Sequence, residues 1–207
     1  MPRSTYVVLL PVKPPARGKS RLDVDPSRRR ALAAAFALDT ARACLAAKGV
    51  VAVLAVTDDA RFADDLRTVG CETMPDGVTG DLNESLRLAA AEAARRWPDG
   101  VPLAVCADLP ALLPGDLDAA LDDVSAAGSR ASFVADHDGV GTTLYTAAYD
   151  GFAPHFGHRS RQAHLDAGVR EITLPVPTLR MDVDDRAALS AAVDLGVGAQ
   201  TRLALRT

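Results

Sequence analysis

Apolar and polar positions alternate along the chain in blocks. Continuous apolar runs followed by polar turns occupy residues 6–10, 50–56 and 101–107, and such runs are typical of strands buried on both faces of a sheet. Segments with helix start signals lie between these runs. Regular alternation of strands with helices predicts a mostly parallel sheet that carries helices on both faces.

Helix boundaries are marked by polar residues, prolines and glycines. Asp25 followed by Pro26 predicts the start of a helix, which we expect to end at Gly49. We expect a short third strand over residues 70–74. Further helices are predicted from residues 57–59 to about 68 and over 82–97, 114–127, 160–167 and 185–195.

The pattern changes after residue 127. Residues 131–135, 142–146 and 171–174 read as strands, and 179–184 as a short extended run. We therefore expect one domain over residues 1–207, in which 1–127 form a nucleotide-binding half and 128–207 an acceptor-binding part.

Composition excludes several classes of protein. The 207 residues carry a formal net charge of −4, whereas general nucleic-acid binders are strongly basic. No apolar run approaches the ~18 residues of a membrane span, and no leader pattern begins the chain. Cys44, Cys71 and Cys106 form no CxxC pair, which favours a reduced protein. We expect a soluble, cytoplasmic protein without nucleic-acid or membrane partners.

The loop after the first strand is strongly cationic. Lys13, Arg17, Lys19 and Arg21 lie at the predicted carboxyl edge of the sheet, where α/β proteins bind polyphosphates. Residues 18–20 read Gly-Lys-Ser like the end of a Walker A loop, but Lys13 stands where that loop needs its first glycine. A P-loop enzyme is therefore excluded. Taken alone, the loop fits a phosphate site and a solvated basic loop equally well.

Three aspartates carry the other candidate chemistry. Asp108 ends a buried strand, and Asp182 and Asp184 lie two apart on an extended run, which places both on the same side. Each motif has a structural alternative, an N-cap or turn for Asp108 and a helix cap for Asp184. Together with the cationic loop they favour a Mg²⁺-assisted phosphoryl or nucleotidyl transfer site.

Other polar residues have two readings each. Asn83 could contact a nucleoside or cap a helix. Residues 157–160 lead into a short helix whose N–H groups could bind a small anion. His164, on that helix, could reach the anion, but we expect all four histidines to be structural or exposed.

Several motifs occur together in one order: 10–13, 18–22, 81–83, 107–110, 141–143, 156–165 and 181–184. As an ordered set covering nearly the whole chain, they resemble the guanylyltransferases of coenzyme F-420 biosynthesis. These are the 2-phospho-L-lactate guanylyltransferase family and its bacterial branch that uses phosphoenolpyruvate.

The resemblance implies a three-layer α/β/α sandwich of the nucleotide-diphospho-sugar transferase (GT-A-like) nucleotidyltransferase fold, with a mostly parallel mixed sheet. It implies transfer of GMP from GTP to a small phosphorylated three-carbon acid, with release of pyrophosphate. Lys13, Lys19 and Asp108 would be catalytic. The nucleotide site would comprise Leu10, Pro11, Lys13, Lys19, Arg21, Asn83 and Asp108; the acceptor site Thr142, Gly157 and Ser160; and the Mg²⁺ ligands Asp108, Asp182 and Asp184.

One departure from the family pattern is His158-Arg159, where the family tends to have small residues or proline. Alanine and arginine are abundant and lysine is scarce, which indicates a protein from a GC-rich bacterial genome. This composition favours phosphoenolpyruvate as the acceptor, with 2-phospho-L-lactate or 3-phosphoglycerate as alternatives. Rival readings are a molybdenum-cofactor or sugar-phosphate nucleotidyltransferase, whose glycine-rich first loop is missing here, and a non-catalytic nucleotide-binding regulator. A monomer and a homodimer are both compatible with the sequence.

Overall fold

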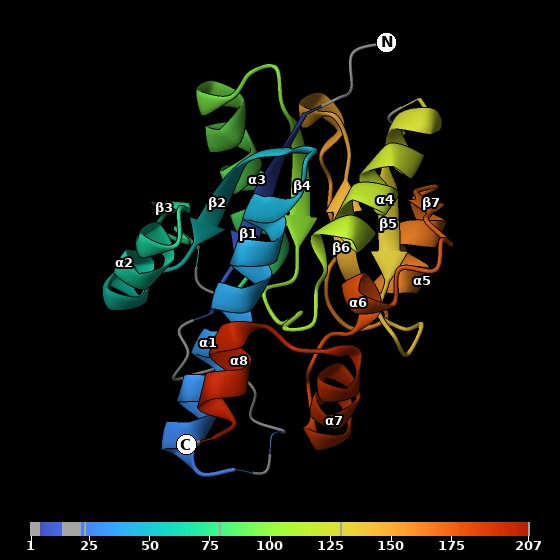
Figure 1. Cartoon of the computed structure of the whole chain (residues 1–207). Coiled ribbons are helices and arrows are strands. Elements are labelled where there is room, and N and C mark those ends of the chain that lie inside the picture. Colours follow the sequence, from blue (N-terminus) through green and yellow to red (C-terminus); the bar gives the residue numbers. More distant parts are fainter. Residues whose placement is uncertain (1–4, 14–21, 23, 79, 129, 207) are drawn as a thin grey trace.

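A seven-stranded sheet forms the centre of the molecule (Figure 1). The computed structural model describes residues 5–13, 22, 24–78, 80–128 and 130–206. The strand order is β3-β2-β1-β4-β6-β5-β7, and only β6 runs antiparallel to its neighbours within this described part. The strands are Tyr6–Pro11 (β1), Val50–Val56 (β2), Glu72–Met74 (β3), Val101–Val105 (β4), Ser132–Ala135 (β5), Thr142–Thr146 (β6) and Arg170–Glu171 (β7). The expected mostly parallel mixed sheet is confirmed.

Helices cover both faces of this sheet. They are Pro26–Ala46 (α1), Ala60–Thr68 (α2), Leu82–Arg96 (α3), Pro114–Ala126 (α4), Ser160–Asp166 (α5), Pro177–Arg180 (α6), Arg186–Leu195 (α7) and Ala199–Ala204 (α8), with a 3-10 turn at Tyr149–Gly151 (η2). Val8 and Leu10 of β1 pack toward α1, α2 and α4, whereas Val7 and Leu9 pack toward α3. The three-layer α/β/α fold predicted from the sequence is confirmed.

Aspartates begin several of the helices, which the sequence predicts for Asp25 and Asp59 but not for Asp81. The carboxylate of Asp25 accepts hydrogen bonds from the N–H groups at the start of α1, and Asp59 and Asp81 do the same for α2 and α3. A side-chain oxygen at this position satisfies N–H groups that have no partner inside the helix. These local signals explain why the helix starts could be found from the sequence.

The extended run expected over residues 179–184 is wrong in its first part. Residues Pro177–Arg180 form α6, where Pro177 occupies a first-turn position that suits proline. Arg180 fixes the helix by donating hydrogen bonds to the carbonyl oxygens of Ala135 (3.0 Å) and Ile172 (2.6 Å). Ala135 is 45 residues away in the sequence, so a local pattern could not reveal this contact.

Two other boundaries also differ from the sequence prediction. The strand expected over 171–174 pairs only at Arg170–Glu171, and α8 was not predicted. Asp39 of α1 explains α8, because its carboxylate accepts the N–H groups of Gln200 (3.0 Å) and Thr201 (2.8 Å). A cap supplied by another helix has no signature in the sequence around residue 200.

Among the described helices, none combines the length and the apolar character needed to cross a lipid bilayer.

Candidate functional site

Three predicted site aspartates gather beyond the carboxyl end of β4. The N–H of Val183 donates a hydrogen bond to the carbonyl oxygen of Asp108 (3.0 Å), which joins the two segments. Val183 is fully buried, whereas Asp182 is partly exposed and Asp184 exposed. The alternation expected of an extended segment therefore holds over residues 182–184, and it turns both carboxylates away from the core.

Asp182 lies in an electrostatically unfavourable place for a carboxylate. Burial and the negative charge of Asp108 raise its pKa to about 6, although a hydrogen bond from His137 acts in the opposite direction. Nδ1 of His137 lies 3.0 Å from Oδ1 of Asp182. Burial opposes protonation of the His137 ring, but the hydrogen bond and charge of Asp182 outweigh it and raise the pKa of His137. The sequence prediction missed His137, because it lies 45 residues from Asp182.

The donor chemistry of this group suits a hard cation. Within the described segments, no three acidic, histidine or cysteine side chains are arranged to hold a metal ion by themselves. Mg²⁺ in nucleotide-dependent enzymes usually has one or two carboxylates, with substrate phosphates and waters completing the shell. Asp108 and Asp182 fit such a shared site, in which the protein supplies part of the coordination.

The loop between β5 and β6 connects this acidic group with the predicted acceptor residues. The carboxylate of Asp136 accepts the N–H groups of Val140 (2.9 Å) and Gly141 (2.7 Å). A Cβ at Gly141 would come too close to that carboxylate, so any other residue there would force the Asp136 side chain to move. The closed loop holds His137 beside Asp182 and leads directly into Thr142.

A β-bulge sets the direction of the Thr142 side chain. Ala135 pairs with Thr142, and the register shifts there so that Thr143 is an additional residue in β6. Bulges of this kind re-aim side chains and are common beside active sites. Thr142 consequently faces α5, where its Oγ1 lies 3.1 Å from Nδ1 of His164.

The other two predicted acceptor residues lie at the start of α5. Ser160 is buried, and its N–H donates to the carbonyl oxygen of Gly157 (3.2 Å). Gly157 has a φ of 133°, which strongly favours glycine. Arg159 has a φ of 55° and is the one non-glycine residue with positive φ in the described segments. The departure from the family pattern at residues 158–159 thus coincides with a left-handed turn.

His164 lies at the centre of the acceptor group, on the helix after Ser160 where the sequence places it, but its contact with Thr142 is not predicted by the sequence. Its ring is fully buried and stacks against the rings of Phe133 (5.1 Å between centroids) and Tyr145 (5.0 Å). The N–H of His155 donates to its Nε2 (3.0 Å). Burial lowers the pKa of His164 to about 4, with a smaller opposing effect from a hydrogen bond to the backbone of Ser160. The ring is therefore neutral at physiological pH.

Asn83 contacts the acceptor loop. Its amide nitrogen donates to the carbonyl oxygen of Phe156 (2.9 Å), and its Oδ1 accepts the N–H of the same residue (2.7 Å). The side chain thereby fixes the backbone next to Gly157 from helix α3. A direct contact of Asn83 with the nucleotide stays a prediction.

The predicted triphosphate loop is only partly described. Lys13 follows β1 and is exposed at the carboxyl edge of the sheet, whereas Lys19 and Arg21 lie outside the described residues. The side chain of Leu10 is fully buried in the core, and Pro11 is partly exposed. Any contact of Leu10 with a ligand would therefore use its backbone.

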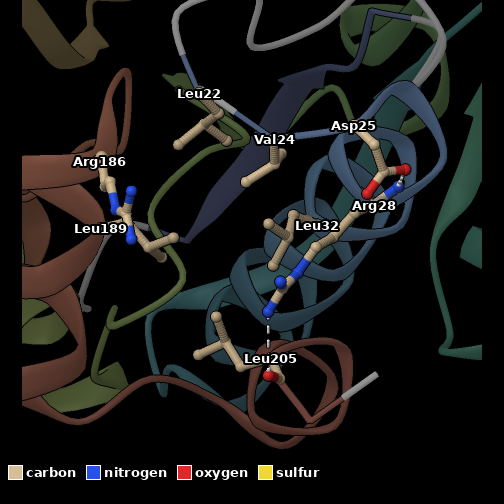
Figure 2. A pocket seen from close by; sticks show the side chains of 8 residues that line it. All are labelled: Leu22, Val24, Asp25, Arg28, Leu32, Arg186, Leu189 and Leu205. Carbon is tan, nitrogen blue, oxygen red and sulfur yellow. Dashed lines mark hydrogen bonds between the residues drawn. The ribbon is translucent and has the colours of Figure 1, made fainter.

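A separate cavity of about 370 Å³ lies among α1, α7 and α8 (Figure 2). Its lining is apolar apart from Asp25, Arg28 and Arg186, and Arg28 donates a hydrogen bond to the carbonyl oxygen of Leu205 (3.3 Å). None of the predicted site residues is among those that line it. They are Leu22, Val24, Asp25, Arg28, Leu32, Arg186, Leu189 and Leu205.

Solved structures support the fold. The chain is similar to a protein from Desulfovibrio desulfuricans described as a nucleotide-diphospho-sugar transferase, with a TM-score of 0.72, 18% identity and coverage of 98% of this chain and 94% of the other. It is also similar to 4-diphosphocytidyl-2C-methyl-D-erythritol synthase, with a TM-score of 0.63, 13% identity and coverage of 93% and 99%. At such identities the likeness concerns the fold alone.

Sequence relatives are much closer. The chain is 44% identical over 201 residues to the phosphoenolpyruvate guanylyltransferase of Thermomonospora curvata, covering 95% of this chain and 87% of the relative. It is 43% identical over 207 residues to the enzyme of the same name from Streptomyces scabiei, covering 96% and 95%. A scan against models of protein families gave no match. The identity over nearly the whole length shows that the chain belongs to the phosphoenolpyruvate guanylyltransferase family.

Proposed function

We propose that this protein transfers GMP from GTP to phosphoenolpyruvate, giving enolpyruvyl-2-diphospho-5′-guanosine and pyrophosphate, as a step of coenzyme F-420 biosynthesis. The observation that carries the proposal is the 44% identity over 95% of the chain to a relative of that name. The arrangement of acidic and hydrogen-bonding groups at the carboxyl edge of the sheet supports it.

The reaction needs position and charge neutralisation more than proton transfer. An oxygen of the acceptor phosphate attacks the α-phosphorus of GTP, and the bond from that phosphorus to the oxygen leading to the β-phosphate breaks, so that pyrophosphate leaves. The attacking oxygen is already an anion, so no general base is required. A site for this reaction must hold two anionic substrates close together in line.

Each group at the site has a task in this proposal. Lys13, with Lys19 and Arg21, neutralises the triphosphate. Thr142, the N–H of Gly157 and the Ser160 hydroxyl hold the acceptor. Asp108 and Asp182, with Asp184 beside them, would hold Mg²⁺, which supplies positive charge to the phosphates. The raised pKa of Asp182 supports this role, because a cation relieves repulsion between its carboxylate and that of Asp108.

The experiment is pyrophosphate release by purified protein with GTP and Mg²⁺, offering phosphoenolpyruvate, 2-phospho-L-lactate and 3-phosphoglycerate in separate reactions. We expect release with phosphoenolpyruvate. Release with only one of the other acids would overturn the proposed acceptor while keeping the reaction class. Silence with all three, in protein that binds GTP, would overturn the proposal.

A further inference from the structure

The orientation of hydrogen atoms around His164 can be worked out from its contacts. The ring has two nitrogens, and in the neutral form one carries hydrogen while the other accepts a hydrogen bond. Nε2 of His164 accepts the backbone N–H of His155 at 3.0 Å. A backbone N–H can only donate, so Nε2 is the acceptor, and the hydrogen of the neutral ring is on Nδ1.

The surroundings keep the ring in this state. His164 is fully buried and stacks against both Phe133 and Tyr145, with interplanar angles of 21° and 22°. A charged imidazolium would lose its hydration there without a carboxylate partner among the described contacts of the ring.

The state of Nδ1 determines what the Thr142 hydroxyl can do. Because Nδ1 carries hydrogen, it donates to Oγ1 of Thr142 across 3.1 Å. The Thr142 hydroxyl is then an acceptor toward His164, and its own hydrogen must point to another group.

We propose that His164 is a positioning residue, which the backbone of His155 holds in the Nδ1–H form so that the Thr142 hydroxyl donates its hydrogen to an anionic oxygen of the acceptor. This inference rests on the proposed function, because it assigns the recipient of that hydrogen to the phosphorylated acid. If Nδ1 instead accepted from Thr142, the hydroxyl would present only lone pairs to the acceptor and repel its negative charge. One buried ring thus selects between attraction and repulsion at Thr142 without contacting the substrate.

The first measurement is the tautomer of His164 in the wild-type protein, by nitrogen-15 NMR of histidine-labelled samples. We expect a neutral ring with hydrogen on Nδ1 at pH 7, which remains neutral down to about pH 5, because burial lowers the pKa to about 4. Hydrogen on Nε2, or a charged ring at pH 7, would overturn the inference. This readout requires neither activity nor a variant that folds.

Kinetics of variants then test the link to the acceptor. Gln at position 164 retains a polar atom near the Nε2 position but no donor at the Nδ1 position, whereas Asn can place its NH₂ group near Nδ1. We expect His164→Gln and Thr142→Val each to raise KM for the acceptor by roughly 10- to 100-fold, the loss of a hydrogen bond to an anion. KM for GTP should change little, and His164→Asn should recover part of the loss.

A double variant separates positioning from general damage. Because His164 acts through Thr142, the His164→Gln/Thr142→Val protein should be no worse for the acceptor than Thr142→Val alone. Thr143→Val is the matched control at the neighbouring residue, and it should leave both KM values unchanged. The inference would be overturned if the rise in acceptor KM in the double variant equalled the product of the two single rises, or if KM for GTP rose equally. An inactive wild-type enzyme would instead contradict the proposed function, and the tautomer would still be measurable.

Discussion

His164 and Asp182, two polar side chains at the carboxyl edge of the sheet, differ in how well the chain compensates for their burial. Around His164, both ring nitrogens have hydrogen-bond partners within the chain, and the neutral ring fits its apolar stack. Around Asp182, burial and the nearby charge of Asp108 disfavour the ionised carboxylate, and the hydrogen bond from His137 offsets this only in part.

The difference separates a region that is complete in the free protein from one that a ligand completes. A satisfied network around a buried ring holds its members in one geometry, which suits the recognition of a small acid by shape and hydrogen bonds. Carboxylates that repel one another store an electrostatic penalty, and a cation removes it on binding.

The largest effect is expected at Asp182. Asp182→Asn keeps the shape of the side chain but removes a charge that would bind Mg²⁺, and we expect turnover to fall by ~10²-fold or more, as for other preorganised electrostatic sites. Pyrophosphate release under saturating GTP and acceptor measures the loss.

Asp185→Asn is the matched control for this variant. Asp185 is a neighbouring carboxylate that accepts the N–H of Ala188 at 2.9 Å at the start of α7. Asn is also a good cap, so both turnover and stability should stay near the wild-type values. Unchanged turnover in Asp182→Asn would remove the aspartates from the proposed mechanism.

The pH dependence of stability without metal is the second test. The pKa of Asp182 rises from 3.8 to about 6 on folding, so between these values the folded state holds a proton that the unfolded state has lost. The free energy of unfolding should therefore fall as pH rises from 4 to 6, by on the order of 2 kcal/mol. His137, whose pKa is also raised on folding, loses its contribution in the same direction at higher pH.

Urea unfolding in EDTA at a series of pH values measures this change. Asp182→Asn should flatten the profile between pH 4 and 6, because it removes the titrating carboxylate. If the wild-type and variant profiles have the same slope there, Asp182 is not the source of the dependence. In the wild type, Mg²⁺ should raise the midpoint more at pH 7 than at pH 5.

Asn83 offers a third test, which asks whether the hydrogen-bonded region around His164 extends to helix α3. Asn83→Ala would leave both backbone groups of Phe156 without their side-chain partner, and we expect a loss of about 1–3 kcal/mol in the free energy of unfolding. KM for the acceptor should rise, because the loop before Gly157 loosens. A rise in KM for GTP with unchanged stability would instead support direct nucleotide contact.

The fold could be predicted from the sequence because its signals are local. Apolar runs identified β1, β2 and β4, and aspartates at helix starts identified α1 and α2. The reversed strand β6 also lay where the sequence placed a strand. Where a partner is distant, as with Arg180 in α6 or Asp39 at the start of α8, the prediction was wrong or incomplete.

The residues of the candidate site likewise separate into those that local sequence signals identify and those that depend on distant contacts. Asp108, Asp182 and Thr142 could be named because they follow strands or match a family motif. His137 could not be named, and for His164 the sequence indicated only its place on the helix after Ser160. Nothing in their spacing shows that one reaches Asp182 and the other Thr142. The β-bulge that turns Thr142 toward His164 is equally invisible, since one additional residue in a threonine-rich strand leaves no compositional trace.

The smallest effect is expected at Thr143, where the satisfied network ends. Its Oγ1 is buried and has no hydrogen-bond partner among the residues that the structure describes, whereas that of Thr142 is hydrogen-bonded to His164. Replacing an unsatisfied buried hydroxyl by a methyl group removes a desolvation penalty, so Thr143→Val should stabilise the protein by up to ~1 kcal/mol. Thr142→Val should destabilise it by a similar amount, because Nδ1 of His164 loses an acceptor. Urea unfolding of the two variants side by side measures this opposition in sign between adjacent threonines. Destabilisation by Thr143→Val would show that its hydroxyl does have a partner, and that the satisfied region extends one residue further along β6.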